Sequence, residues 1–171
     1  MKQYKSLFDI LYVYWKLYGG TAALVFSPYF HLSVLTALIC YPLWWDNDKW
    51  ASLALGSIPN LLGFSVGAFA IILSFGQVSL DLLKNQTEAK SRYLGVVVSF
   101  VHFIIVQSAA LIVAMIGAAW GGKITGAIGS LLFAYAVILA LAASMRLFRL
   151  ARIYNQIKTD DAKPKGDNAA I

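Results

Sequence analysis

The stretch SIPNLLGFSVGAFAIILSFG, residues 57–76, contains no Asp, Glu, Lys, Arg or His. Its length matches the ~20 residues that an α-helix needs to cross the hydrocarbon core of a bilayer. A lipid-facing segment must satisfy its own backbone hydrogen bonds, and the stretch lacks the alternation of a barrel strand, so it is predicted to be a transmembrane helix. Ser57 is expected to cap the start, with Pro59 in the first turn, where a missing N–H costs nothing.

One face of this predicted helix carries small or polar side chains at spacings of three or four residues. They are Asn60, Gly63, Gly67, Ala70 and Ser74. Two glycines four residues apart allow a second helix backbone to approach closely. The pattern therefore predicts a packing face, either within the chain's own bundle or against another subunit.

The composition of the whole chain is that of a membrane protein. Of its 171 residues, 60% are hydrophobic and only 13% are charged, whereas soluble domains carry roughly 25% charged residues. The net charge of +6 comes from residues beside hydrophobic segments, which favours contact with anionic lipid over nucleic acid. Cys40 is the only cysteine, so neither an intramolecular disulfide nor a cysteine metal site is expected.

An all-α, polytopic fold is predicted, with the termini outside the membrane. Residues 1–20 are expected to form an amphipathic interfacial helix, because apolar side chains recur at spacings of three or four opposite Lys2, Lys5 and Lys16. Its apolar face can lie on the membrane, pack on the protein's own bundle, or do both. Residues 151–171 are expected to be the basic end of a cytoplasmic helix, followed by a disordered tail from about Thr159.

Within residues 21–150, a bundle of four transmembrane helices is predicted. The spans are about 28–45, 57–80, 93–120 and 124–146. Residues 51–58 are apolar and can form either a short interfacial helix or the first turns of a kinked second span, which the short preceding turn favours. In the fourth span, Gly126 and Gly129 belong to a second close-packing face.

The distribution of Lys and Arg predicts the orientation. The N-terminal arm, the middle loop and the C-terminal segment hold twelve of the 14 basic residues, and the two short turns hold Lys49 and Lys123. The positive-inside rule then places both termini in the cytoplasm, for a multi-pass protein of the bacterial inner membrane. Four tryptophans are expected at the outer interface: Trp44, Trp45, Trp50 and Trp120. The candidate contacts for lipid or a partner are Lys2, Lys5, Lys16, Arg146, Arg149 and Arg152.

The sequence carries no signature of an enzyme. It has no HExxH, GxSxG or P-loop, and none of its eight acidic residues lies deep in a predicted span. No cofactor, metal site or catalytic residue is expected. The intramembrane polar candidates are His102, Ser99 and Gln107. A neutral His102 hydrogen-bonded to Ser99, Asn60 or a carbonyl would join helices, while proton-coupled, gating and pore-lining roles stay open.

These observations favour a non-enzymatic membrane subunit that associates with copies of itself. It would present a basic cytoplasmic surface to a protein partner or to anionic lipid. One alternative is a homo-oligomeric pore or membrane-perturbing effector, for example in phage defence. Another is a small proton-linked carrier that uses His102. Membrane lipids, further copies of the chain and a cytoplasmic or membrane protein are the expected partners, and nucleic acid is not.

Overall fold

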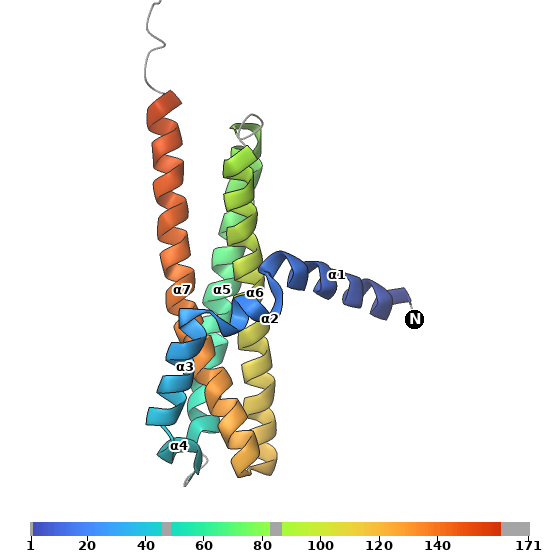
Figure 1. Cartoon of the computed structure of the whole chain (residues 1–171), viewed down its shortest axis with the longest axis vertical. Helices are drawn as coiled ribbons and strands as arrows, with labels where there is room; N and C mark the ends of the chain where they lie inside the picture. Colours follow the sequence, from blue (N-terminus) through green and yellow to red (C-terminus); the bar gives the residue numbers. More distant parts are fainter. Residues whose placement is uncertain (1, 46–48, 83–86, 162–171) are drawn as a thin grey trace, which may run out of the picture.

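A computed structural model of the chain describes residues 2–45, 49–82 and 87–161, and each element in these ranges is an α-helix. The helices are α1 (Lys2–Tyr18), α2 (Gly20–Val25), α3 (Pro28–Ile39), α4 (Pro42–Trp45), α5 (Lys49–Leu82), α6 (Thr87–Trp120) and α7 (Lys123–Asp161). The long helices α5, α6 and α7 run side by side, α3 and α4 lie along one half of them, and α1 projects sideways (Figure 1). The predicted all-α fold class is confirmed.

Three helices are long and apolar enough to cross a membrane. Their candidate spans are Lys49–Ser74, Tyr93–Trp120 and Lys123–Arg149. The segment predicted as a first span, 28–45, is instead divided into two short helices. Because Pro42 lacks an N–H and its ring clashes with the preceding turn, α3 stops at Ile39 after 12 residues, a length of about 18 Å.

The helix α5 begins earlier than the sequence predicts. Residues 49–82 form one continuous helix with Pro59 inside it. Residues 51–58 are therefore the first turns of this helix, the alternative that the short preceding turn favours, and Ser57 does not cap its start. The apolar residues before Ser57 continue the helix because Trp50, Ala54 and Ile58, spaced four apart, are buried against the neighbouring helices. This packing offsets the backbone hydrogen bond that a proline inside a helix removes.

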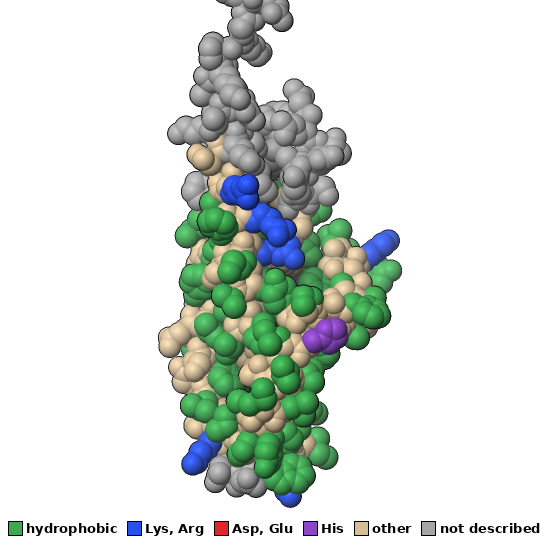
Figure 2. Space-filling model, turned by 60° about the vertical axis from the view of Figure 1, so that its left-hand side comes forward, with side chains coloured by type: hydrophobic (Ala, Val, Ile, Leu, Met, Phe, Trp, Pro, Cys, Tyr) green, Lys and Arg blue, Asp and Glu red, His purple; other side chains and the backbone are tan. Residues whose placement is uncertain are grey.

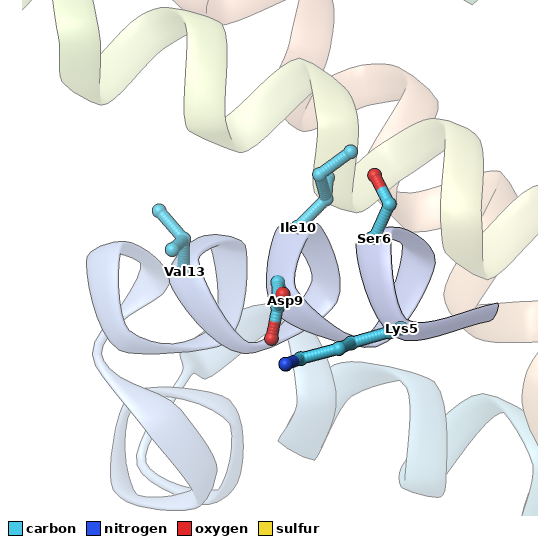
Figure 3. A pocket seen from close by; sticks show the side chains of 5 residues that line it. All are labelled: Lys5, Ser6, Asp9, Ile10 and Val13. Atoms are coloured by element: carbon cyan, nitrogen blue, oxygen red, sulfur yellow. The ribbon is translucent and has the colours of Figure 1, made fainter. Parts of the chain in front are cut away.

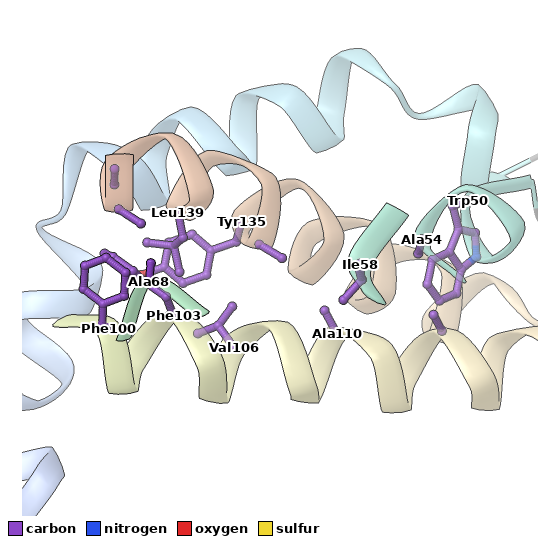
Figure 4. Packing of buried hydrophobic residues seen from close by; sticks show 14 of the residues in the cluster. Trp50, Ala54, Ile58, Ala68, Phe100, Phe103, Val106, Ala110, Tyr135 and Leu139 are labelled. Carbon is purple, nitrogen blue, oxygen red and sulfur yellow. The ribbon is translucent and has the colours of Figure 1, made fainter. Parts of the chain in front are cut away.

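The core lies between α5, α6 and α7 (Figure 4). Phe100 and Phe103 of α6 pack together with their ring centroids 5.4 Å apart, near Leu139 and Tyr135 of α7 (Figure 4). Buried alanines such as Ala110 keep the helices close elsewhere along their length. Small side chains at these contacts are typical of helix packing in membranes.

Trp50 fills a space that three glycines leave open. A Cβ atom on Gly129 would lie 2.1 Å from the nearest indole carbon, and one on Gly117 would lie 2.3 Å away. The third glycine, Gly126, lies against the backbone of Trp44. Gly126 and Gly129, both predicted to pack against a neighbouring helix, therefore contact Trp44 and Trp50. Trp50 is the second residue of α5 and its side chain is 1% exposed, so it packs inside the bundle; its depth at the membrane interface stays a prediction.

The other tryptophans of this group remain near the same end of the bundle. Trp120 is 86% exposed, and the ammonium of Lys123 lies 4.2 Å from the ring centroid of Trp45, an attractive cation–π geometry. This end, marked by Trp45, Trp120 and Lys123, is called the tryptophan end below. The opposite end, where α5 stops at Leu82 and α6 starts at Thr87, is called the hairpin end.

Two glycine pairs make the sharp turns of the chain. Gly19 and Gly20 have φ values of +102° and +68°, and Gly121 and Gly122 have values of +64° and +103°, a region that glycine enters without steric cost. The first pair ends α1 as predicted, and the second reverses the chain between α6 and α7. Helix α7 continues through Thr159 to Asp161, so the disorder predicted from Thr159 is wrong for residues 159–161; residues 162–171 lie outside the described residues.

Candidate functional site: a tyrosine–histidine cluster beside an apolar groove

The described polar side chains converge most closely where α1 packs on α6, with Tyr135 contributed by the neighbouring α7. The Oη atom of Tyr14 lies 2.5 Å from Nδ1 of His102, and Oη of Tyr135 lies 3.0 Å from Nε2. Tyr18 stacks on the imidazole with the ring centroids 4.0 Å apart. His102 is 3% exposed, so these contacts satisfy a buried polar group that would otherwise be costly in a membrane.

The predicted partners of His102 are different from those in the structure. The hydroxyl of Ser99 donates to the carbonyl of Gly95, 2.7 Å away in its own helix. The side-chain amide of Asn60 faces the carbonyl of Gly56 at 3.5 Å. A serine that bonds back to the preceding turn is already satisfied, which leaves His102 to the tyrosines.

Neither Tyr14 nor Tyr135 was predicted as a partner of His102. Tyr135 lies in an apolar span, and a buried tyrosine usually has a hydrogen-bond partner for its hydroxyl, so this signal was present in the sequence. Tyr14 comes from a separate helix 88 residues away, and no local pattern indicates that contact.

One O–H group of this cluster has no acceptor within the cluster. A neutral imidazole donates from one ring nitrogen and accepts at the other, so one tyrosine donates to His102 and the other accepts from it. The accepting tyrosine keeps a free O–H. When the accepting tyrosine is Tyr14, no further hydrogen-bond acceptor for its hydroxyl is found among the described residues.

The Tyr14 hydroxyl stays protonated at neutral pH. Burial, with a smaller contribution from the neighbouring Tyr18, raises the pKa of Tyr14 to about 12. Desolvation has this effect because it disfavours the charged phenolate. Tyr14 therefore acts as a hydrogen-bond donor over the whole physiological range.

An apolar groove of about 570 Å³ lies beside this cluster, between α1 and the bundle. From α1 it is lined by Phe8, Leu11, Tyr12, Tyr14 and Trp15, and from the other helices by Leu24, Phe30, His102, Ile105, Val106, Leu132 and Tyr135. Apart from the tyrosines, tryptophan and His102, these side chains are entirely hydrocarbon. An apolar pocket with a few converging polar groups is the usual form of a small-molecule site.

A second hollow lies on α1 alone and has a different character. Lys5, Ser6, Asp9, Ile10 and Val13 line it, and all five come from the same helix (Figure 3). Lys5 and Asp9 are exposed and lie on one side of the helix. Because no other element closes this hollow, it is an open surface of α1.

The predicted small-residue face of α5 lies on the surface of the bundle. Asn60, Gly63, Gly67, Ala70 and Ser74 are all exposed, and a Cβ atom on Gly63 or Gly67 would meet no atom within 4 Å. The Ser74 hydroxyl donates to the carbonyl of Ala70. The described part of the chain therefore leaves this face open to lipid or to another molecule.

Gln107 has a different environment from His102. It is fully buried, and neither atom of its side-chain amide has a partner among the described residues; the same is true of the Ser65 hydroxyl. An unpaired polar group in an apolar interior costs free energy, so these two side chains are the least satisfied polar groups of the bundle.

The predicted basic contacts lie mainly on the surface. Lys5, Lys16, Arg149 and Arg152 are exposed and Arg146 is half-buried; the side chain of Lys2 lies outside the described side chains. Figure 2 shows Lys and Arg gathered toward one end of a face that is otherwise largely hydrophobic. Along α7, Arg146 and Arg149 lie in the last turn of the membrane-length stretch and Arg152 follows it, on the side of the hairpin end.

Among the residues that the structure describes, no group of three His, Cys, Asp or Glu side chains could hold a metal ion. No protein-family model, curated protein or solved structure matches this chain.

Proposed function

We propose that the protein is a non-enzymatic, multi-pass membrane subunit that assembles through the open face of α5. The observation that supports this most directly is the exposure of Gly63 and Gly67, with no atom near their missing side chains. Leaving glycines on a lipid-facing surface gains no packing, whereas a second helix could approach closely there. The occupant that fits this face best is α5 of another copy of the chain.

The assembled subunit would present its basic surface to a partner in the cytoplasm or to anionic lipid. Arg149 is the last residue of the candidate span of α7, Arg152 lies beyond it, and Lys16 is exposed on α1. We place both termini on the cytoplasmic face of a bacterial inner membrane, because basic residues concentrate there. In this arrangement α1 lies along the membrane surface, and α3 and α4 together form a fourth, shorter membrane segment.

Native mass spectrometry of the full chain, extracted gently from its host membrane, tests the assembly. Wild-type protein is expected as a defined oligomer, and Gly63→Leu and Gly67→Leu are expected to shift it to the monomer. Gly95→Leu is the matched control, because this glycine of α6 is also exposed with no atom within 4 Å. Loss of the oligomer in all three variants, or in none, would contradict the proposed face.

The basic surface is tested by charge reversal. Arg146→Glu, Arg149→Glu and Arg152→Glu together are expected to abolish recovery of a stoichiometric partner, or binding to vesicles of phosphatidylglycerol, without loss of insertion. If neither changes, the role of the basic surface is refuted.

A homo-oligomeric pore is the alternative that the same measurements address. Ion leak from liposomes that disappears with Gly63→Leu would favour a pore lined near the α5 face. The serine in that face already bonds to its own helix, which makes the face a poor lining for ions and favours the accessory-subunit interpretation.

A further inference from the structure

We propose that the groove between α1 and the bundle holds one acyl chain of a membrane phospholipid, with the Tyr14 hydroxyl as donor to its ester carbonyl. This proposal does not depend on the oligomer or on the basic surface. It depends on the depth of the groove in the membrane, on the apolar character of its walls, and on the free O–H of Tyr14 at the end of the groove near the membrane boundary.

The depth of the groove follows from the length of α6. Eighteen residues separate His102 from Trp120 at the tryptophan end, which is about 27 Å of helix. The hydrocarbon core of a bilayer is about 30 Å thick. The candidate span Tyr93–Trp120 is longer than this core requires. With Trp120 at one boundary, the other boundary falls near His102, and the exposed Lys5 and Lys16 of the docked α1 fit that position.

The groove extends from this boundary into the hydrocarbon. Ile105 and Val106 follow His102 toward the tryptophan end of α6, and Leu132 precedes Tyr135 on the same side along α7. The walls nearer the tryptophan end are thus at the depth of the acyl chains, and α1 covers the groove on the side of the membrane boundary. The medium that reaches them is lipid and not water.

The walls accept hydrocarbon and little else. Their exposed surface is overwhelmingly apolar, so water would find few partners there, and an empty groove would forfeit the dispersion contacts of its lining. The volume of about 570 Å³ falls in the range of ~300–1,000 Å³ that small-molecule sites occupy. Apart from Met1, the three undescribed segments of the sequence contain no apolar run, since residues 46–48, 83–86 and 162–171 read DND, LKNQ and AKPKGDNAAI.

The polar groups of the groove lie at its upper end, where a phospholipid changes from hydrocarbon to ester. His102 has both ring nitrogens engaged, so it does not bind the lipid itself. In the tautomer in which Nδ1 donates to Tyr14, the Tyr14 O–H is left to donate into the groove. An ester carbonyl at the boundary is an acceptor of the right kind.

Photocrosslinking of the full chain in lipid tests the proposal. The protein is reconstituted in vesicles of phosphatidylethanolamine and phosphatidylglycerol that include phosphatidylglycerol with a diazirine in its acyl chain. After irradiation, peptide mass spectrometry locates the crosslinks. We expect a several-fold excess of crosslinks on groove residues over the exposed residues of α5.

Two variants fill the groove, and one matched control does not. Ile105→Trp and Leu132→Trp are each expected to lower the groove crosslinks several-fold. Ile112→Trp places the same side chain seven residues further along α6, at an exposed position outside the groove, and is expected to leave them unchanged. Helical content measured by circular dichroism verifies that each variant folds.

The outcomes separate this proposal from the proposed assembly. Gly63→Leu is expected to keep the groove crosslinks even where it breaks the oligomer. Crosslinks spread evenly over the exposed helices, or unaffected by both groove variants, would overturn the proposal. Native mass spectra would also overturn it if the molecule that the groove-filling variants lose is a lipid-soluble ring compound or a second copy of the chain.

Discussion

At the scale of single residues, Trp50 and the glycines around it set the spacing of three helices. The indole is buried, and Gly117 of α6 and Gly129 of α7 face it from two sides. A glycine opposite a large ring lets two helices approach while the ring fills the space between them. The stability of the tryptophan end therefore depends on glycines that have no side chain to contribute.

Gly129→Ala is expected to destabilise the bundle. The new Cβ atom would lie 2.1 Å from the indole of Trp50, and overpacking of this kind costs about 1–3 kcal/mol. Unfolding in mixed micelles by titration with dodecyl sulfate, followed by tryptophan fluorescence, measures the change. Gly63→Ala, with no atom near its Cβ, is the control and is expected to keep or raise the stability. Equal destabilisation of the two variants would refute the proposed role of the Trp50–Gly129 contact.

The sequence indicates some of these residue-scale features. Gly126 and Gly129 are correctly identified as packing residues because small residues at helical spacing are a local pattern. The burial of Trp50 is not predicted, because a tryptophan beside a polar turn resembles an interfacial anchor. Its burial depends on glycines that are 67 or more residues later in the chain, and a single sequence does not reveal such pairs.

At the scale of elements, few contacts hold α1 on the bundle. The directional one is the hydrogen bond between Tyr14 of α1 and His102 of α6. The helix projects from the bundle (Figure 1), and large apolar side chains such as Tyr4 and Phe8 are exposed on it. Loss of a bond to His102 should therefore loosen α1 while the long helices stay folded.

Tyr14→Phe is expected to increase hydrogen exchange of the α1 amides several-fold. The substitution leaves one ring nitrogen of the buried His102 without its partner, which costs about 1–3 kcal/mol. Exchange measured by mass spectrometry in lipid nanodiscs should rise in α1 and stay constant in α5 and α6. Tyr4→Phe, at a 71% exposed position, controls for loss of a hydroxyl from the same helix, and equal exchange in both variants would show that the bond does not hold α1.

Element prediction from the sequence succeeds where hydrophobic runs are long. The spans of α6 and α7 match their predicted ranges closely, and α1 is a helix over its predicted length. The division of residues 28–45 is missed because an apolar run with Pro42 near its end fits either one bent helix or two short ones. The site is predicted only as a buried His102, since its partners come from two other helices.

At the scale of the whole molecule, the charges are distributed along the long axis. Lys49 and Lys123 lie near the tryptophan end, and the arginines of α7 lie at and beyond the other end of its candidate span. The proposed orientation uses this asymmetry, because cytoplasmic segments are enriched in Lys and Arg.

Labelling with a membrane-impermeant maleimide tests the orientation. In a Cys40→Ser background, Lys123→Cys is expected to react in intact spheroplasts, because it lies at the proposed outer end. Arg149→Cys is expected to react only after the membrane is made permeable. Reaction of Arg149→Cys in intact spheroplasts would reverse the assignment of the two faces.

The sideways projection of α1 also affects the shape of the membrane. With α1 in one boundary as proposed, the protein adds the area of a 17-residue helix to a single leaflet, and the described residues hold no counterpart at the tryptophan end. Such a cross-section is a wedge, and interfacial helices are sensitive to curvature. The molecule should therefore concentrate where the cytoplasmic leaflet that holds α1 is convex, as it is around a vesicle that buds toward the cytoplasm, and it should be depleted from cell poles, where that leaflet is concave.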